Sequence, residues 1–162
     1  MFMLHSTRNH LVDRIRRAFG GAPCRLQVAA LPWRRNGDGI EVLLVTSRET
    51  RRWVLPKGWP EGREDLHEAA AREAGEEAGV SGDISPREAG RFYYDKIQPS
   101  GAAMRCQVLV FPMEVDQVAD KWRERKKRER AWFSPSEAAA HVREPDLAEL
   151  IQRFDAHRFE RA

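Results

Sequence analysis

The sequence predicts a single α+β domain. Its 162 residues suit one compact unit with a hydrophobic core. Short runs of β-branched and aromatic residues alternate with turn signals, which is typical of strands. Two further segments have helical periodicity. No repeat or low-complexity linker divides the chain, so we treat residues 1–23 as an N-terminal extension, possibly helical, and residues 24–162 as the domain.

Six strands are expected after the extension. The first two, at residues 25–33 and 40–48, are separated by the turn sequence "RRNGDG", whose Asn-Gly and Asp-Gly steps favour a hairpin. A short third strand at residues 53–58 ends in proline and glycine. The others are expected at residues 90–97, 103–115 and 128–134, where apolar runs are bounded by Pro, Gly and charged residues.

Two helices are expected within the domain. The first runs from about Leu66 to Ala78, after Asp65 as N-cap with Glu68 in a capping-box position, and before Gly79 as the left-handed residue that follows a helix. The second begins in "SPSEAAAHV" and, after a break around Pro145, continues through "DLAELIQRF".

The N-terminal extension has three possible interpretations. Its apolar residues form one helical stripe among arginines: Leu11, Ile15, Ala18 and Phe19, with Arg14, Arg16 and Arg17 around them. This pattern fits a surface-seeking helix or an Arg-rich transit peptide. Alternatively, the segment packs on the domain or frays, as chain ends often do.

Composition excludes several classes of protein. Cys24 and Cys106 are far apart, and no Cys or His spacing resembles a zinc motif, which argues for a reducing cytoplasm and against structural zinc. The longest apolar runs are of strand length, so we expect a soluble, cytoplasmic protein without a transmembrane segment. A net charge of +3 modestly favours anionic partners but is too small to indicate nucleic acid.

The first helix ends in an unfavourable cluster of charges. Glu73, Glu76 and Glu77 lie in its last turns, where the helix dipole is already negative. At about 100° per residue they fall within an arc of about 100° that also contains the helix's apolar residues. Carboxylates turned toward the protein body are costly unless they are paired or bind a metal.

Either cations or a metal ion could stabilise this cluster. Arg72 is adjacent, but one arginine cannot neutralise three carboxylates. Clustered oxygen ligands without sulfur or imidazole suit Mg²⁺, with Mn²⁺ possible. The helix alone leaves a surface salt-bridge network as an equal alternative.

The wider spacing resembles the signature of the Nudix hydrolases, Gly-x5-Glu-x7-Arg-Glu-U-x-Glu-Glu-x-Gly-U, in which U is a bulky aliphatic residue. The matching positions are Gly58, Glu64, Arg72, Glu73, Glu76, Glu77, Gly79 and Val80. Ala74 departs from the pattern, since a bulky aliphatic residue is expected there.

The resemblance implies an α/β/α sandwich around a mixed sheet and a metal-dependent hydrolysis of a diphosphate linkage. It implies Glu73 and Glu77 as the main Mg²⁺ ligands, Glu76 as a further ligand or the catalytic base, and the Gly58 carbonyl as another ligand. Arg72 and Glu64 would form an ion pair that holds loop and helix together. Bound Mg²⁺ would neutralise diphosphate oxygens and orient the attacking water.

Outside the signature, the chain is most similar to the subgroup that hydrolyses diphosphoinositol polyphosphates and diadenosine polyphosphates. The similar stretches are "EVLLVTSRETRRWVLPKG" and "KKRERAWFSPSEAAAHV". Within "PKGW", Lys57 and Trp59 replace a glycine-richer turn. The expected substrate-binding residues are Arg51, Arg52, Lys57, Lys126, Lys127 and Arg128. The alternative for residues 121–130 is a solvated loop.

Two other functions remain as alternatives. One is removal of pyrophosphate from RNA 5′ ends, although nucleic acid is not expected because no interleaved stacking platform is evident. The other is a non-catalytic sensor of a phosphorylated metabolite. Several aromatic residues could stack on a base, with the core or the cleft wall as the ordinary alternative: Trp33, Trp53, Phe92, Tyr93 and Trp132. The sequence does not predict an oligomeric state.

Overall fold

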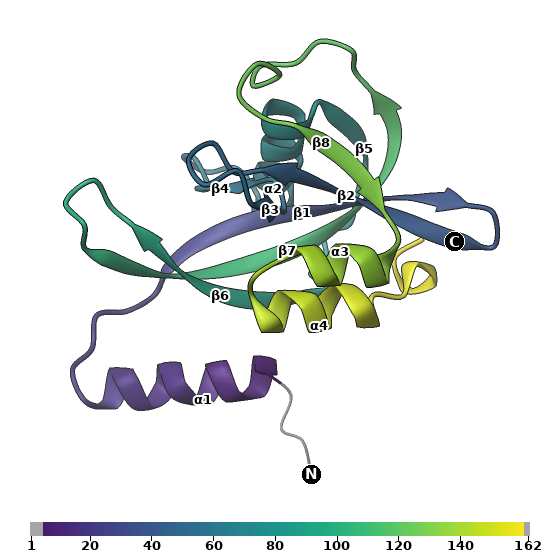
Figure 1. Ribbon diagram of the computed structural model, residues 1–162. Helices are drawn as coiled ribbons and strands as arrows, with labels where there is room; N and C mark the ends of the chain where they lie inside the picture. The colour runs from purple at the N-terminus through teal and green to yellow at the C-terminus, as the bar shows by residue number, and fades with distance from the viewer. Residues whose placement is uncertain (1–4, 161–162) are drawn as a thin grey trace.

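The computed structural model describes residues 5–160, which form an eight-stranded sheet with helices around it (Figure 1). The strands are β1 Arg25–Asn36, β2 Gly39–Thr46, β3 Trp53–Val54, β4 Lys57–Gly58, β5 Val80–Ile84, β6 Gly90–Ile97, β7 Ala103–Val118 and β8 Arg130–Phe133. The helices are α1 His5–Ala18, α2 Leu66–Glu73, α3 Pro135–His141 and α4 Pro145–Arg153, with a π-helical turn at Ala74–Ala78 and a 3₁₀ turn at Ala156–Arg158.

The sheet is mixed, as predicted. Its main path runs β3-β2-β1-β7-β5, while β4 pairs with β1, β6 with β7 and β8 with β2. The two central strands, β1 and β7, are parallel, from Arg25 opposite Cys106 to Trp33 opposite Glu114. All the other strand pairs are antiparallel.

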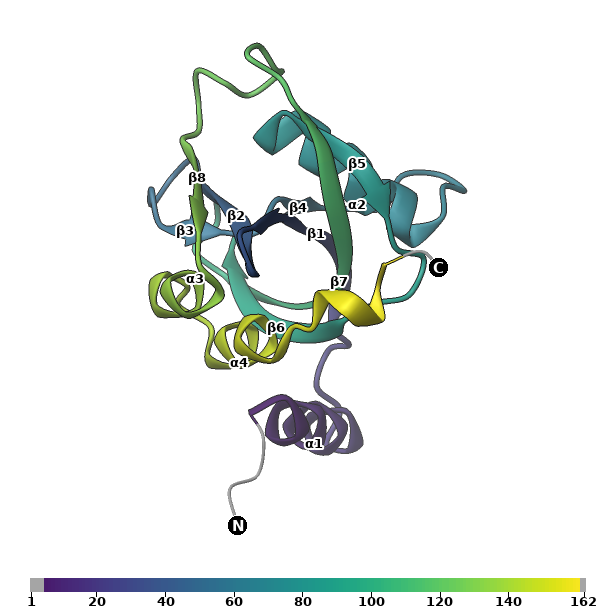
Figure 2. The same ribbon diagram turned by 90° about the vertical axis from the view of Figure 1, so that its right-hand side faces the viewer.

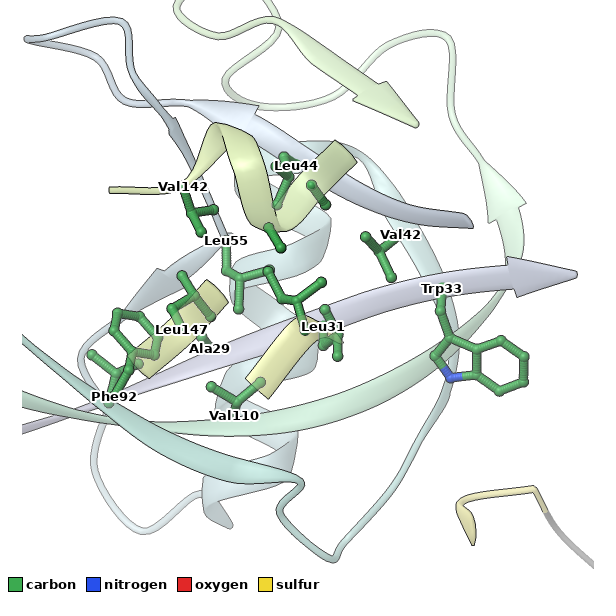
Figure 3. Close-up of a cluster of buried hydrophobic side chains, with 14 of the residues drawn as sticks. Ala29, Leu31, Trp33, Val42, Leu44, Leu55, Phe92, Val110, Val142 and Leu147 are labelled. Carbon is green, nitrogen blue, oxygen red and sulfur yellow. The ribbon is translucent and has the colours of Figure 1, made fainter. Parts of the chain in front are cut away.

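The sheet separates two apolar layers, which confirms the predicted sandwich. Successive residues of β1 contribute to opposite layers: Ala29 and Leu31 to one, Val28 and Ala30 to the other. The first layer packs beneath α3 and α4, where Leu147 meets strand residues such as Leu31 (Figure 3). The second packs beneath α2. Figure 2 shows α2 and the α3–α4 pair on opposite sides of the strands.

Four local predictions differ from the structure. The α-helix that begins at Leu66 ends at Glu73 and continues as a π-turn. Asp65 has an extended backbone but its side chain forms no capping hydrogen bond, so the capping box is wrong; its carboxylate lies within 4.8 Å of ligand atoms of His67 and Glu68 instead. Residues 53–58 make two separate short pairings, with β2 and with β1. Finally, β5 was not predicted.

The missed strand has a physical explanation. The β5 sequence "VSGDI" contains Ser, Gly and Asp, of which Gly and Asp are depleted in strands. Its pairing with β7 supplies the order that the local sequence does not.

The predicted C-terminal helix forms two helices, α3 and α4. A capping box between Ser134 and Glu137 starts α3.

The N-terminal segment forms α1, which packs against α4 and β6 (Figure 1). Asn9 Nδ2 donates to Asp146 Oδ2 at 2.7 Å, and His10 Nδ1 lies 2.8 Å from the Tyr93 hydroxyl. Among the described residues, no helix is long and apolar enough to span a membrane.

Candidate active site

A cleft of about 470 Å³ lies beside the end of α2 and the π-turn. Its lining comes from β1, β3, β4, β6, α2 and the π-turn, together with the segments after β2, after β4, before β8 and between α3 and α4. The acidic lining residues are Glu49, Glu61, Glu73, Glu76, Glu77, Asp95 and Glu124. The basic ones are Arg48, Arg52, Lys57, Lys96, Arg128 and Arg143. The cleft therefore places many acidic and many basic side chains close together.

Small residues bring α2 and the π-turn close to the sheet. Ala69, Ala70, Ala74 and Ala78 are fully buried in the layer beneath α2. Ala74 stands where the Nudix pattern has a bulky aliphatic residue, and its small side chain is fully buried in the layer between this helix and the sheet. Glu73 and Glu77 lie on the same buried side, with 9% and 8% of their surface exposed. π-turns occur frequently at functional sites, where they change the direction of side chains along a helix.

Glu73 packs against the backbone of Gly58. A Cβ atom at position 58 would lie 2.3 Å from Glu73 Oε1, so any side chain there would displace the Glu73 carboxylate. Arg72 Nη1 donates to the same oxygen at 2.8 Å. Burial raises the pKa of Glu73, and the Arg72 guanidinium opposes that shift.

Glu77 is held between two donors. The Lys57 backbone N–H donates to Oε2 at 3.1 Å, and Arg128 Nη2 donates to Oε1 at 2.7 Å. Burial raises the pKa of Glu77 to about 7, while Arg128 and Lys57 oppose the shift. Burial also lowers the pKa of the Lys57 ammonium group.

Glu76 is more exposed than its two neighbours, with 32% of its side chain accessible. Arg123 Nη1 donates to its Oε1 at 2.9 Å. Arg72 Nη1, which binds Glu73, also lies 3.9 Å from Glu76 Oε2. Arg72 and Arg123 therefore share Glu76, while Arg128 binds Glu77. In the described part of the chain, the one group of three potential ligands within 4.8 Å of one another is Asp65, His67 and Glu68, on the first turn of α2 and outside the cleft lining.

Arg72 joins the loop before α2 to the helix. Its Nη2 donates to Glu64 Oε1 at 2.7 Å and its Nε to Glu64 Oε2 at 3.2 Å. The same Nη2 donates to the Trp59 carbonyl at 3.1 Å. These hydrogen bonds lower the pKa of Glu64. The loop is thereby fixed next to Gly58 and Glu73.

The segment between β7 and β8, together with the first residue of β8, stabilises the end of the π-turn. Gly79 has a left-handed φ of 65°, and a Cβ there would lie 2.7 Å from Trp122 Cγ. Trp122 Nε1 donates to the Glu77 carbonyl at 3.1 Å, and Arg130 Nη1 to the Ala78 carbonyl at 2.8 Å. These donors satisfy carbonyl groups that a helix end leaves unpaired.

The predicted substrate-binding residues separate into two groups. Arg52, Lys57 and Arg128 line the cleft. Arg51, Lys126 and Lys127 are exposed and are not among its lining residues. Arg48, Lys96 and Arg143 line the cleft but were missed by the sequence reasoning. Strand alternation could have indicated Lys96, which shares a face of β6 with Tyr94.

Two aromatic residues, Trp59 and Tyr94, line the cleft. Arg25 and Lys96 lie 5.5 and 5.4 Å from the Trp59 ring centre, and Lys57 Nζ lies 5.2 Å from that of Tyr94. The aromatic residues considered in the sequence lie elsewhere. Trp33, Phe92 and Tyr93 are buried, Trp53 packs on Phe133, and Trp132 lies beneath Arg34.

The structure has a mixed sheet between helical layers, and glutamates at the Nudix spacing lie beside a charged cleft, as in a hydrolase of phosphorylated compounds. Comparison with known families matches residues 25–154 to the NUDIX domain. The chain therefore belongs to the Nudix hydrolase family, whose members act on pyrophosphate linkages, and it is an enzyme of that kind.

Individual relatives support the same assignment. The chain is 34% identical over 140 residues to "Nudix hydrolase 21, chloroplastic" of Arabidopsis thaliana, covering 84% of this chain and 69% of the relative. It is 32% identical over 132 residues to "Diphosphoinositol polyphosphate phosphohydrolase 3-beta" of Bos taurus, covering 79% and 76%. It spans 58% and 60% of the length of two other Arabidopsis thaliana Nudix hydrolases.

A solved structure resembles the fold. The crystal structure of a C. elegans Ap4A hydrolase aligns with a TM-score of 0.57 and 20% identity, covering 83% of this chain and 98% of that one. This structural similarity supports the Nudix fold and says nothing about the substrate.

Proposed function

We propose that the chain is a Mg²⁺-dependent hydrolase that cleaves a phosphoanhydride bond in a polyphosphorylated small molecule, with a diphosphoinositol polyphosphate favoured and a diadenosine polyphosphate as the next candidate. One observation carries the proposal: the buried carboxylates of Glu73 and Glu77 line a cleft together with six basic side chains. Carboxylates suit a hard cation, and the basic side chains suit several phosphate groups.

The residues present fit a divalent metal ion. Glu73 and Glu77 would hold Mg²⁺ together with the Gly58 carbonyl, and the close packing of Gly58 on Glu73 supports this set. Carboxylate and carbonyl oxygens also suit Mn²⁺. When bound, the metal would supply charge neutralisation for the diphosphate and for the leaving phosphate. Arg72 pairs with Glu73 and Arg128 pairs with Glu77, so metal binding must compete with these ion pairs.

Glu76 is proposed as the base that accepts a proton from the attacking water. It lines the cleft and is more exposed than Glu73 or Glu77. General-base assistance is typically worth roughly a hundred- to ten-thousand-fold in rate. Glu76→Gln should therefore reduce kcat by this amount at saturating Mg²⁺. Recovery of kcat at higher Mg²⁺ would identify Glu76 as a ligand only.

The basic side chains of the cleft favour the inositol substrate. A diphosphoinositol polyphosphate carries many phosphates beyond the one that is cleaved, and the six lining cations would pair with them. Three of these cations, Arg48, Arg52 and Arg128, would have to exchange a glutamate for a phosphate. A diadenosine polyphosphate requires stacking for two bases, and the two aromatic rings in the lining, Trp59 and Tyr94, are already close to cations. The bovine relative's name also supports the inositol substrate for this chain.

A substrate panel tests the proposal. We would compare catalytic efficiencies on a diphosphoinositol polyphosphate, a diadenosine polyphosphate, a nucleoside diphosphate sugar and an RNA with a 5′ triphosphate. The inositol compound should be preferred, and a higher efficiency on any of the others would contradict that choice. Repeated release of phosphate per protein molecule distinguishes an enzyme from a non-catalytic sensor.

Matched variants then locate the substrate contacts. Arg48→Gln with Lys96→Gln alters two cations of the cleft wall, while Lys126→Gln with Lys127→Gln alters two exposed ones. The first pair should raise KM for the inositol substrate and weaken its dependence on salt. If the exposed pair has the larger effect, the phosphates lie over the segment before β8 rather than in the cleft.

A cytoplasmic location is part of the proposal and rests on Cys24 and Cys106, which are free thiols. The names of several plant relatives include chloroplastic and mitochondrial forms. Microscopy of the fluorescently tagged chain in its own cells would distinguish these compartments.

A further inference from the structure

The N-terminal helix α1 is attached to the domain by its polar side. Asn9 bonds to Asp146 of α4, and His10 bonds to Tyr93 of β6. Asp13, with only 4% of its surface exposed, accepts hydrogen bonds from Arg17 and from the Cys24 thiol. These hydrogen bonds fix the rotation of the helix about its axis.

The opposite side of α1 is apolar and exposed. Leu11, Val12 and Ile15 have 47–49% of their surface exposed, and Phe19, which continues the helical hydrogen bonding through its N–H to Ile15, has 86%. These four account for most of the large apolar residues that are exposed in the described part of the chain. A helix of a water-soluble domain normally has the reverse orientation, with its apolar side toward the core. Figures 1 and 2 show α1 on the outside of α4 and β6.

Arginines accompany this apolar side. At about 100° per residue, the four apolar residues span an arc of about 100°. Arg14 and Arg16 border the arc on its two sides, and Arg8 lies within it; all three are exposed. The one acidic residue between positions 5 and 19 is Asp13, which faces the domain. From Arg8 to Phe19, the exposed side of α1 therefore carries apolar and positively charged side chains, and the single acidic residue lies on the other side, against the domain.

We propose that α1 binds the surface of a membrane that contains anionic lipids. A helix with an apolar side and flanking arginines lies in the interface, where the apolar residues enter the headgroup boundary and the arginines meet lipid phosphates. The charge of the helix selects this partner over a second copy of the chain. In a two-fold dimer through this face, the same arginines would oppose one another without an acidic partner.

This binding goes beyond hydrolysis and does not depend on which diphosphate is cleaved. The cleft lining begins at Gln27 and includes no residue of α1. The helix could thus hold the domain on a membrane while the cleft stays accessible to a dissolved substrate. Attraction would be weakened by salt because the arginines are exposed.

Sedimentation of the full-length protein with vesicles tests this inference. The protein should pellet with phosphatidylcholine vesicles that contain phosphatidylserine, and not with pure phosphatidylcholine vesicles. Arg14→Gln with Arg16→Gln should weaken binding roughly thirtyfold, from the typical contribution of each arginine near an anionic surface. Ile15→Gln with Phe19→Gln should weaken it at least tenfold, since two inserting side chains are lost.

Control variants carry the same changes elsewhere. Val118→Gln alters an exposed apolar residue at the end of β7, and Arg63→Gln an exposed arginine before α2. Both should bind vesicles as the unmodified protein does. Hydrolysis of a dissolved substrate should be unchanged in the α1 variants, which shows that they are folded. Absence of binding to anionic vesicles, or binding that the α1 variants do not weaken, would overturn the proposal. So would a dimer in solution that the α1 variants dissociate.

Discussion

Glu77 combines burial with two hydrogen-bond donors, and its proposed role depends on that combination. Only 8% of its surface is exposed, yet its oxygens face the Lys57 N–H and the Arg128 guanidinium. A buried carboxylate is stable in such a position only while a positive group neutralises it. Arg128 provides this charge in the described structure, and a metal ion is proposed to provide it during catalysis.

Replacing Glu77 should therefore abolish strong metal binding. We expect Glu77→Gln to weaken Mg²⁺ binding by on the order of a hundredfold or more, since even outer partners of a metal site can be worth ten- to a hundredfold. Calorimetric titration measures this affinity. Glu68→Gln, which alters the group formed by Asp65, His67 and Glu68, should leave it unchanged. The opposite result would assign the ion to that group.

The affinity for Mg²⁺ should also depend on pH. Burial raises the pKa of Glu77 to about 7, so the metal-free carboxyl is protonated below pH 7 and ionised above it. Metal binding requires the ionised form and releases the proton. The association constant should therefore fall by about tenfold per pH unit below pH 7 and level off above it. Titrations in buffers of different ionisation enthalpy would count the released proton. An equal slope in Glu77→Gln would assign the proton to another group.

At the scale of elements, the main feature is the contact between the π-turn and the segment between β7 and β8. Helical periodicity predicted that Glu73, Glu76 and Glu77 would face the protein body, because spacing along one helix is local information. It could not predict Arg123 as the partner of Glu76 or Arg128 as the partner of Glu77. These arginines lie 47 and 51 residues later in the sequence than Glu76 and Glu77, and only the folded sheet brings them together.

The π-turn was unpredictable for a related reason. The sequence between Ala74 and Ala78 contains nothing that distinguishes a π-turn from an α-helix. Its geometry is accompanied by long-range contacts: Trp122 packs on Gly79, and Arg130 binds the last carbonyl groups. Residues 121–130, for which the sequence leaves a phosphate contact or a solvated loop as alternatives, therefore also complete the end of the π-turn.

Removing the buried arginine of this segment should destabilise the metal-free protein. Arg128 has 8% of its side chain exposed and binds Glu77, Glu124 and the Thr46 carbonyl. Breaking one side of a buried ion pair typically costs about 3–5 kcal/mol, so Arg128→Ala should lower the melting temperature strongly. Added Mg²⁺ should restore part of the loss, because it also neutralises Glu77. Arg123→Ala is the matched control: its side chain is 72% exposed, and the melting temperature should hardly change.

At the scale of the whole molecule, periodicity predicted an α+β domain, and the resemblance to the Nudix hydrolases predicted its sandwich arrangement. Alternation along β1 and β2 places residues in two layers, and the apolar side of α4 covers one of them. It did not predict how the strands are ordered, since the parallel pairing of β1 with β7 joins residues about 80 positions apart in sequence. The cleft depends on that order, which explains why Lys96 on β6 and Arg48 after β2 were missed as lining residues.

The attachment of α1 to the domain gives a final prediction. Deleting residues 1–19 removes three side-chain hydrogen bonds between the described part of this segment and the rest of the chain: those of Asn9 with Asp146, of His10 with Tyr93 and of Asp13 with the Cys24 thiol. Asp146 retains the N–H groups of Tyr93 and Leu147 as donors, so no buried carboxylate is left unpaired. Three hydrogen bonds are typically worth roughly 1.5–4.5 kcal/mol together. The melting temperature should fall by on the order of 5 °C for a chain of this size. Because no cleft residue precedes Gln27, kcat/KM on a dissolved substrate should be preserved. A large loss of kcat/KM in a folded deletion variant would show that α1 supports the cleft, and that the extension is part of the catalytic domain.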